Sequence, residues 1–175
     1  MSMLSLNQLA VLGRHRWTIP VIAAVAERQG ARSVELLHAL PISRESLARA
    51  LVQAADGGWI MRNLGHGHPL RPEYVLTEKG TSVAEAVCML ERAKAALGLT
   101  PGRLGRWCLP VLRQIGEGET RFNALERTLG VASPRALTLT LKALAHEELV
   151  VRHVVDDWPP VTRYALTQRG RTLNA

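Results

Sequence analysis

The sequence repeats itself: shifted by 90 residues, the second half of the chain lies on the first. Residues of uncommon types coincide in order, which chance does not explain between two Ala- and Leu-rich segments. Between about residues 31 and 40 the shift is 89, which places a one-residue length change in a loop. We therefore expect two similar domains, at residues 1–80 and 100–175. The matched pairs include Trp17 with Trp107, Pro20 with Pro110, Ser43 with Ser133, Tyr74 with Tyr164 and Gly80 with Gly170.

The segment between the two copies has the pattern of a single helix. Residues 78–99 carry apolar side chains at helical spacing, and Gly98 ends the pattern just before Pro101. We therefore expect a connecting helix over residues 81–99 rather than a flexible tether. The stripe consists of Val83, Ala86, Val87, Leu90, Ala93, Lys94 and Leu97.

The second copy has the clearer succession of elements. Apolar periodicity predicts helices over residues 107–115 and 121–129, the latter capped by Thr120. Ser133 and Pro134 then form an N-cap and first turn of a helix that runs to about residue 147. Two short helices joined by a tight turn at Gly130 are typical of a helix-turn-helix, whose second helix enters the DNA groove.

Strands follow the third helix in both copies. Residues 149–155 and 161–167 predict a β-hairpin, which in this position is a wing, and residues 168–173 a last helical turn. The first copy predicts helices over 17–29, 33–40 and 43–55, and a hairpin of 59–63 with 74–77. The expected fold is therefore mainly α with small β-hairpin wings (α+β): two tandem winged helix-turn-helix domains joined by a long helix.

Several segments of the second copy resemble the HxlR-type winged-helix transcriptional regulators. They follow one another through residues 103–173 and include Gly105-Arg106-Trp107, Arg121-Phe122-Asn123-Ala124-Leu125, Ser133-Pro134-Arg135-Ala136-Leu137-Thr138 and Pro159-Pro160-Val161-Thr162-Arg163-Tyr164. The first copy resembles the family only through its match to the second.

The resemblance implies a bacterial or archaeal transcription regulator that binds double-stranded DNA. Members usually carry one such domain and act as homodimers on near-palindromic operators, so this chain is expected to form a homodimer or an internal pseudo-dimer. Many members carry a redox-responsive Cys shortly before the Gly-x-Trp segment. Here Cys88 lies further upstream and Cys108 follows the Trp, so the resemblance does not extend to thiol sensing.

The charge of the chain also favours an anionic partner. Its formal net charge is +7 and its pI is about 10.4, and nucleic acid is the first such partner to consider. Residues 1–90 carry nine Lys and Arg against seven Asp and Glu, whereas residues 91–175 carry thirteen against eight. The second copy is therefore the expected main DNA binder.

The leucine spacing of the third helix decides which side chains are offered to DNA. If Leu137, Leu141 and Leu144 face the core, the opposite face carries residues that can read bases. Arg121 and Ser133 are expected on phosphate, and the wing contributes further basic groups. The expected DNA-binding residues of the second copy are Arg121, Ser133, Arg135, Thr138, Leu139, Lys142, Arg152, His153 and Arg163.

The first copy keeps fewer of these groups. Ser43, Arg44 and Arg49 remain candidates for DNA contact, but Glu45 stands where the second copy has Arg135, and Ala48 where it has Thr138. The first copy is therefore expected either to bind a different half-site or to serve as a dimerisation scaffold.

Other chemistry finds little support in the sequence. No phosphate-binding loop, nucleophile elbow or paired carboxylates are present, so neither an enzyme nor a cofactor is expected. His66-Gly67-His68 is interpreted as a polar wing turn rather than a metal site, and Cys88, Trp17 and Trp107 as core. Without an apolar run of 18 residues or a secretory signal, we expect a cytoplasmic protein outside the membrane.

A second function stays open at this stage. A winged helix can bind a protein instead of DNA, and an exposed Leu139 together with the weak first recognition helix is compatible with such an interaction module. A sensor gated by a ligand or by redox state is a third possibility.

Overall fold

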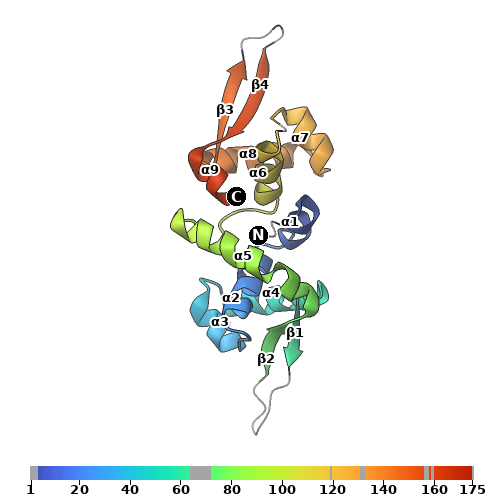
Figure 1. Ribbon diagram of the computed structural model, residues 1–175, viewed down its shortest axis with the longest axis vertical. Coiled ribbons are helices and arrows are strands. Elements are labelled where there is room, and N and C mark those ends of the chain that lie inside the picture. The colour runs from blue at the N-terminus through green and yellow to red at the C-terminus, as the bar shows by residue number, and fades with distance from the viewer. Residues whose placement is uncertain are drawn as a thin grey trace. The chain divides into compact units, whose positions relative to one another are not determined.

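The computed structural model describes residues 4–63, 72–118, 120–130, 133–155, 158 and 160–174. They form two compact units. Unit 1 consists of residues 15–103 with Leu4, and unit 2 of residues 5–14 and 104–174. Each unit is mainly helical and carries one two-stranded antiparallel hairpin (Figure 1). The expected fold class, helices with small hairpin wings, is confirmed.

Unit 1 is built around an apolar helix. Val21, Ile22 and Val25 of this helix, α2, have no exposed surface, and α4 and α5 pack against it. The hairpin pairs Ile60 with Leu76. In chain order the elements are α2 (Thr18–Glu27), α3 (Ser33–Ala39), α4 (Arg44–Asp56), β1 (Ile60–Asn63), β2 (Glu73–Leu76) and α5 (Glu78–Ala96).

Unit 2 has the same order around its own central helix, α6, in which Val111 and Leu112 are fully buried. Helices α7 and α8 and strand β4 pack on α6. The elements are α6 (Cys108–Gly116), α7 (Phe122–Leu129), α8 (Pro134–His146), β3 (Val150–Val155), β4 (Val161–Leu166) and α9 (Gln168–Leu173). To these the start of the chain adds α1 (Leu6–Leu12).

Helix α1 is not anticipated by the periodicity analysis, although it has a local signal. Ser5 and Gln8 form a capping box, each side chain bonded to the other's backbone N–H. Leu9 and Leu12 are buried, and α1 packs on α6. Unit 2 is therefore discontinuous in sequence, because a segment that precedes unit 1 in the chain completes it.

The two units repeat each other in hydrogen bonds as well as in sequence. Thr77 caps α5 and Thr167 caps α9. Each hydroxyl also donates a hydrogen bond of 2.6 Å to a carbonyl oxygen that precedes the first strand of its unit, that of Gly58 or of Glu148. Three residues later stand Gly80 and Gly170. A Cβ on either would lie about 2 Å from the carbonyl oxygen of Trp59 or Leu149, so only glycine fits there.

Some expected details are wrong. Thr120 does not cap the second helix of unit 2: the N-cap is Arg121, and the carbonyl of Thr120 accepts from Tyr164 N–H at 2.8 Å instead. Trp17 and Trp107 are half-buried rather than core. A neighbouring guanidinium lies over each indole, with Arg16 at 5.4 Å and Arg106 at 4.6 Å from the ring centroids.

The expected connecting helix begins earlier than residue 81. Helix α5 starts at Glu78 because Thr77 caps it, and it ends at Ala96, before Gly98 with φ +72°. Its buried side includes Val83, Val87 and Cys88.

Candidate nucleic-acid interface

Helix α8 presents one polar face outward. Ser133 caps the helix and Pro134 occupies its first turn, as the sequence predicts. The three leucines of the opposite face, Leu137, Leu141 and Leu144, are 0%, 4% and 0% exposed, which confirms their inward direction. The outward face carries the exposed side chains of Arg135, Thr138, Leu139 and Lys142, spaced i, i+3, i+4 and i+7.

Two hydroxyls near the start of α8 already have partners. Ser133 Oγ accepts from Ala136 N–H at 3.3 Å, and Thr138 Oγ1 donates to the carbonyl of Pro134 at 2.9 Å. Ser133 retains its own proton to donate, whereas Thr138 offers outward a methyl group and an acceptor oxygen. Thr138 is therefore suited to an apolar contact or to a donor on a base edge.

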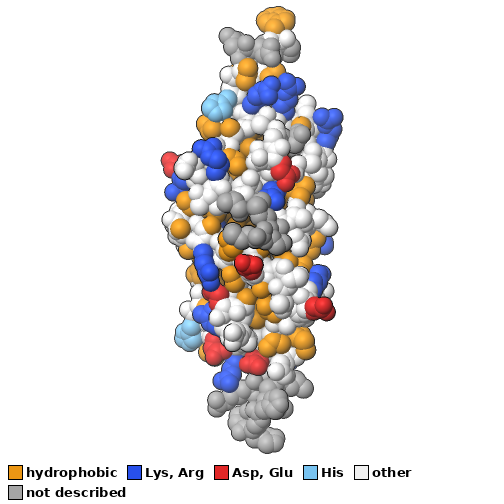
Figure 2. Space-filling model, viewed as in Figure 1, with side chains coloured by type: hydrophobic (Ala, Val, Ile, Leu, Met, Phe, Trp, Pro, Cys, Tyr) orange, Lys and Arg blue, Asp and Glu red, His pale blue; other side chains and the backbone are white. Residues whose placement is uncertain are grey.

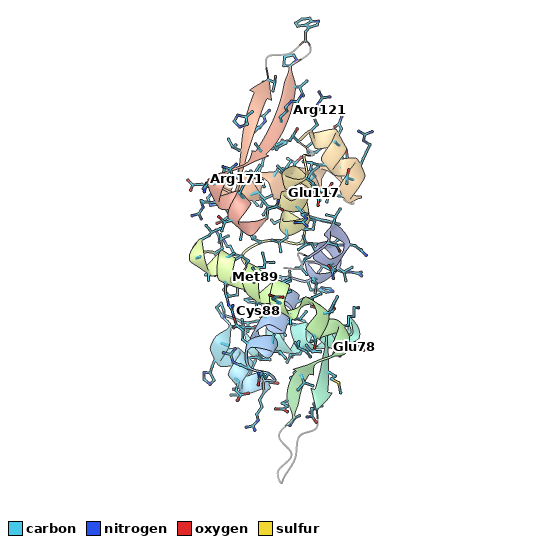
Figure 3. The ribbon with its side chains drawn as sticks, in the orientation of Figure 1. Glu78, Cys88, Met89, Glu117, Arg121 and Arg171 are labelled. Carbon is cyan, nitrogen blue, oxygen red and sulfur yellow. The ribbon has the colours of Figure 1, made fainter. Side chains whose placement is uncertain are left out.

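The wing brings together residues that are far apart in sequence. Strands β3 and β4 pair His153 opposite Arg163, and an isolated antiparallel bridge pairs Arg163 with Arg121 at the N-terminus of α7. Residues directly opposite each other on antiparallel strands have their side chains on the same face. His153, Arg163 and Arg121, all exposed, therefore form a row across one face of the hairpin, which we call the basic row. Figure 3 labels Arg121 beside the hairpin.

Arg152 does not join the basic row. It is paired with Tyr164, on the other face of the hairpin from His153, and its Nη2 donates to Thr162 Oγ1 at 3.2 Å. Arg152 and the basic row can thus contact an anion only from opposite sides of the wing.

Unit 1 places its candidates differently. Ser43 caps α4 and donates to Ser46 Oγ at 3.0 Å, and Arg49 Nη2 donates to the same oxygen at 3.3 Å. This chain of hydrogen bonds holds the Arg49 guanidinium toward the helix N-terminus. Arg44 is exposed beside it.

The wing of unit 1 reverses the charge of its counterpart. Glu73, which the 90-residue shift matches to Arg163, lies opposite Asn63 and accepts from its side-chain amide at 3.4 Å. Figure 2 shows basic side chains over β4 and α7 on the visible face of unit 2, with acidic side chains elsewhere on that face, and mixed acidic and basic side chains on unit 1.

The sequence predicted Arg121 and Arg163 as DNA contacts, but not that the two residues lie opposite each other. A signal existed, because the repeat matches Tyr74 with Tyr164. Both tyrosine N–H groups donate a hydrogen bond of 2.8 Å to a carbonyl oxygen just before the second helix of their unit, that of Ala31 or of Thr120. The loss of the wing cation in unit 1, at Glu73, was missed as well, although the same 90-residue shift reveals it.

The two thiols are buried side chains. Burial raises the pKa of Cys108 to about 11, with a smaller rise from Glu147 and an opposing hydrogen bond from the backbone of Gly105. Burial also raises the pKa of Cys88, with Glu27 and Glu91 adding to the rise and Arg92 opposing it. Both thiols are therefore protonated at neutral pH and poorly reactive.

Within the described parts of the chain, no group of three His, Cys, Asp or Glu side chains is placed to hold a metal ion. His66 and His68 lie outside the described residues. The helices that the structure describes include none with the length and apolarity needed to span a membrane.

Comparison with known proteins bears on both units. A family model described as HxlR-like helix-turn-helix matches residues 11–97 and, separately, residues 104–175. An HTH-type transcriptional regulator of Methanothermobacter thermautotrophicus is 32% identical over 89 residues, covering 51% of this chain and 63% of the relative. The regulator YdeP of Bacillus subtilis is 35% identical over 69 residues, or 39% of this chain and 54% of the relative.

A further HTH-type regulator, from Synechocystis, is 35% identical over 68 residues, which is 39% of this chain and 50% of the relative. The matched part of this chain thus spans roughly half to under two thirds of the length of these relatives. No solved structure matches the chain significantly.

Proposed function

The chain belongs to the HxlR-like helix-turn-helix family, with two copies of the domain in tandem, and on this premise we propose that it is a transcriptional regulator that binds double-stranded DNA. Unit 2 is the main reader, with α8 in the major groove and the β3–β4 wing beside it. Related chains named as HTH-type transcriptional regulators support the proposal.

The observation that carries the proposal is the meeting of three basic groups on the wing. Arg121, Arg163 and His153 come from separate parts of the sequence, yet they share one face. Two like charges placed opposite each other repel, and an anion lying against them relieves this repulsion. A phosphate of the DNA backbone is such an anion.

The face of α8 supplies the base contacts in this proposal. Arg135 lies in the first turn, where it can reach guanine O6 and N7 with two hydrogen bonds, and the exposed methyl of Thr138 suits thymine. Leu139 adds an apolar contact, and Lys142 and Ser133 hold phosphate. Arg152 holds phosphate on the other face of the wing from the basic row. Unit 1 adds Ser43, Arg44 and Arg49.

The expected assembly is a homodimer or an internal pseudo-dimer acting in the cytoplasm. Units 1 and 2 would then be the two DNA-binding domains, and the chain passes from the first to the second after α5. No cofactor and no catalytic residue enter the proposed action.

The test is a gel-shift titration of the whole chain against genomic fragments at two salt concentrations. The affinity is expected to fall steeply with salt, by about a factor of ten per phosphate contact for each decade of concentration. Arg135→Ala is expected to relax sequence preference, and Arg121→Ala to weaken all sequences alike. If folded protein retards no fragment at low salt, the proposal is wrong.

The exposed side chain of Leu139, with 57% of its surface accessible, favours a second candidate. In that case α8 binds a protein partner through Leu139 instead of reading bases. A stable protein complex that survives nuclease treatment and is lost in Leu139→Ala, with no DNA retarded, would support this candidate over the regulator.

A further inference from the structure

Helix α4 of unit 1 presents an outward face that can be compared position by position with that of α8. Both helices follow a capping serine, Ser43 or Ser133, and both turn the same positions toward the core. In α4 the buried side chains include Leu47, Leu51 and Ala54, and in α8 their equivalents are Leu137, Leu141 and Leu144. The two outward faces are therefore placed alike within their own units.

The chemistry of the two faces differs at every equivalent position. Glu45, Ala48, Arg49 and Val52 stand where α8 has Arg135, Thr138, Leu139 and Lys142, and all eight side chains are exposed. Val52 is 59% exposed. Among the described residues no cation forms an ion pair with Glu45. A free carboxylate thus occupies the first-turn position where α8 carries its arginine.

This exchange alters which base the position can recognise. A carboxylate has only acceptor atoms, so it cannot contact guanine O6 or N7, but it accepts from the N4 amino group of cytosine. Ala48 and Val52 present methyl groups, which suit the C5-methyl of thymine. The face of α4 is therefore able to read bases, but a different set from that of α8.

The phosphate contacts of unit 1 are weaker by the same comparison. Val52 replaces Lys142, and Glu73 replaces Arg163 of the basic row, whereas Arg44 and Arg49 stand where α8 has Pro134 and Leu139. These exchanges, together with Glu45 for Arg135, remove three cations, add two and add two carboxylates. A carboxylate that faced the backbone would be repelled, so unit 1 gains less from counterion release. Its contribution to binding then depends more on base contacts than that of unit 2, which makes it more sensitive to sequence.

We propose that the two units read unlike half-sites, unit 2 selecting guanine through Arg135 and unit 1 selecting cytosine through Glu45 at the equivalent helix position. The DNA site that one chain reads is then asymmetric in base sequence. The inference rests on the proposed function, since it assumes that the chain binds duplex DNA.

The experiment is in vitro selection of bound duplexes from a random library, with the whole chain. The wild type is expected to enrich two unlike half-sites. Glu45→Gln replaces the carboxylate with an amide, which reads adenine, so one position of one half-site should change from cytosine to adenine with about a tenfold preference. Arg135→Gln is the matched control: it should change guanine to adenine in the other half-site only.

A second variant guards against an uninformative loss of folding, and circular dichroism checks each protein. Glu45→Arg should change the same position from cytosine to guanine, so that the two half-sites agree there. If Glu45→Gln and Glu45→Arg raise affinity for all sequences alike with no change of base, Glu45 only repels phosphate and the inference fails.

Two further outcomes separate this inference from the proposed function. Enrichment of a single half-site, or of two identical ones, overturns the inference while leaving DNA binding intact. Enrichment of no duplex by folded wild-type protein overturns the proposed function, and the inference with it.

Discussion

Arg121 and Arg163 lie directly opposite each other in an antiparallel bridge between the start of α7 and strand β4. The register continues to His153 on β3, so each of three neighbouring chain segments contributes one basic side chain to the same face. In the other unit the position of Arg163 is held by Glu73. The arrangement therefore costs unit 2 some stability when no anion is bound, which is typical of a binding surface.

Replacing one of these arginines by glutamate should separate stability from binding. In Arg163→Glu the like-charge pair with Arg121 becomes an opposite-charge pair, so the free energy of unfolding should rise by about 0.5–1 kcal/mol. The same change removes a phosphate contact, and the log–log salt dependence of DNA affinity should become shallower by about 0.9. Urea unfolding and gel-shift titrations measure the two effects.

The matched control is Arg127→Glu, the same charge reversal at an exposed position of α7, where the guanidinium Nε donates to the carbonyl of Asn123. It should leave the salt slope unchanged. Equal losses of DNA affinity in both variants, with unaltered slopes, would mean that net charge rather than the basic row governs binding.

Glu148 has a left-handed backbone conformation, and its counterpart in unit 1, which has the same conformation, is a glycine. It lies just before β3 with φ +56°, where unit 1 has Gly58 at φ +71°. A side chain in this left-handed region costs about 1–2 kcal/mol, which glycine avoids at the expense of about 0.5–1 kcal/mol in backbone entropy. Glu148→Gly should therefore stabilise the protein by about 0.5–1 kcal/mol, measured by chemical unfolding.

The control is the opposite exchange in unit 1. Gly58→Ala introduces a Cβ at the same backbone geometry, without a close contact to backbone atoms, and should destabilise by about 1 kcal/mol. If both substitutions are neutral, the left-handed strain at Glu148 does not exist in solution.

The fold followed from patterns that are local or that repeat. Ser133 and Pro134 mark the start of α8 because capping and a missing N–H are chain-neighbour effects, and the leucine spacing assigns the buried face. The strands were expected because alternation follows the third helix in both copies.

The unanticipated features are those that depend on distant contacts. Helix α1 has only seven residues, and its burial depends on α6, about a hundred residues away. Similarly, the periodicity of residues 121–129 predicts a helix but not which strand residue lies beside its first turn, so the pairing of Arg121 with Arg163 required the tertiary structure. Trp107 looked like core because its spacing is apolar, and only the structure shows Arg106 over the ring.

The buried thiol of Cys108 should make stability depend on pH in the alkaline range. Its pKa is raised from 9.0 to about 11 in the folded protein, so folding favours the neutral thiol. The stabilisation is complete below pH 9 and is lost as the pH rises from 9 through 11, by about 2–3 kcal/mol in total. Cys108→Ala lacks this loss of stability.

The measurement is urea unfolding of the wild type and Cys108→Ala at several pH values from 7 to 11. Lysine and tyrosine titrations are common to both proteins and cancel in the difference. The wild type should lose stability relative to the variant only above pH 9. A difference that stays constant up to pH 11 would mean that the thiol is accessible to water.

Ser133 combines a structural and a proposed binding role that substitution can divide. Its Oγ accepts from Ala136 N–H and so caps α8, while its proton remains available for a phosphate. Ser133→Ala removes the cap and should cost about 1 kcal/mol of stability. Ser133→Asp keeps a capping oxygen and adds a favourable charge at the helix N-terminus, so stability should be preserved. DNA affinity should nevertheless fall in Ser133→Asp, because the carboxylate repels phosphate.

The same pair of substitutions at Ser43, which caps α4 in the same way, tests whether unit 1 approaches the backbone equally closely. With the weaker phosphate contacts argued for unit 1, Ser43→Asp should reduce affinity less than Ser133→Asp; an equal or greater loss would place both helices at the same distance from the DNA backbone.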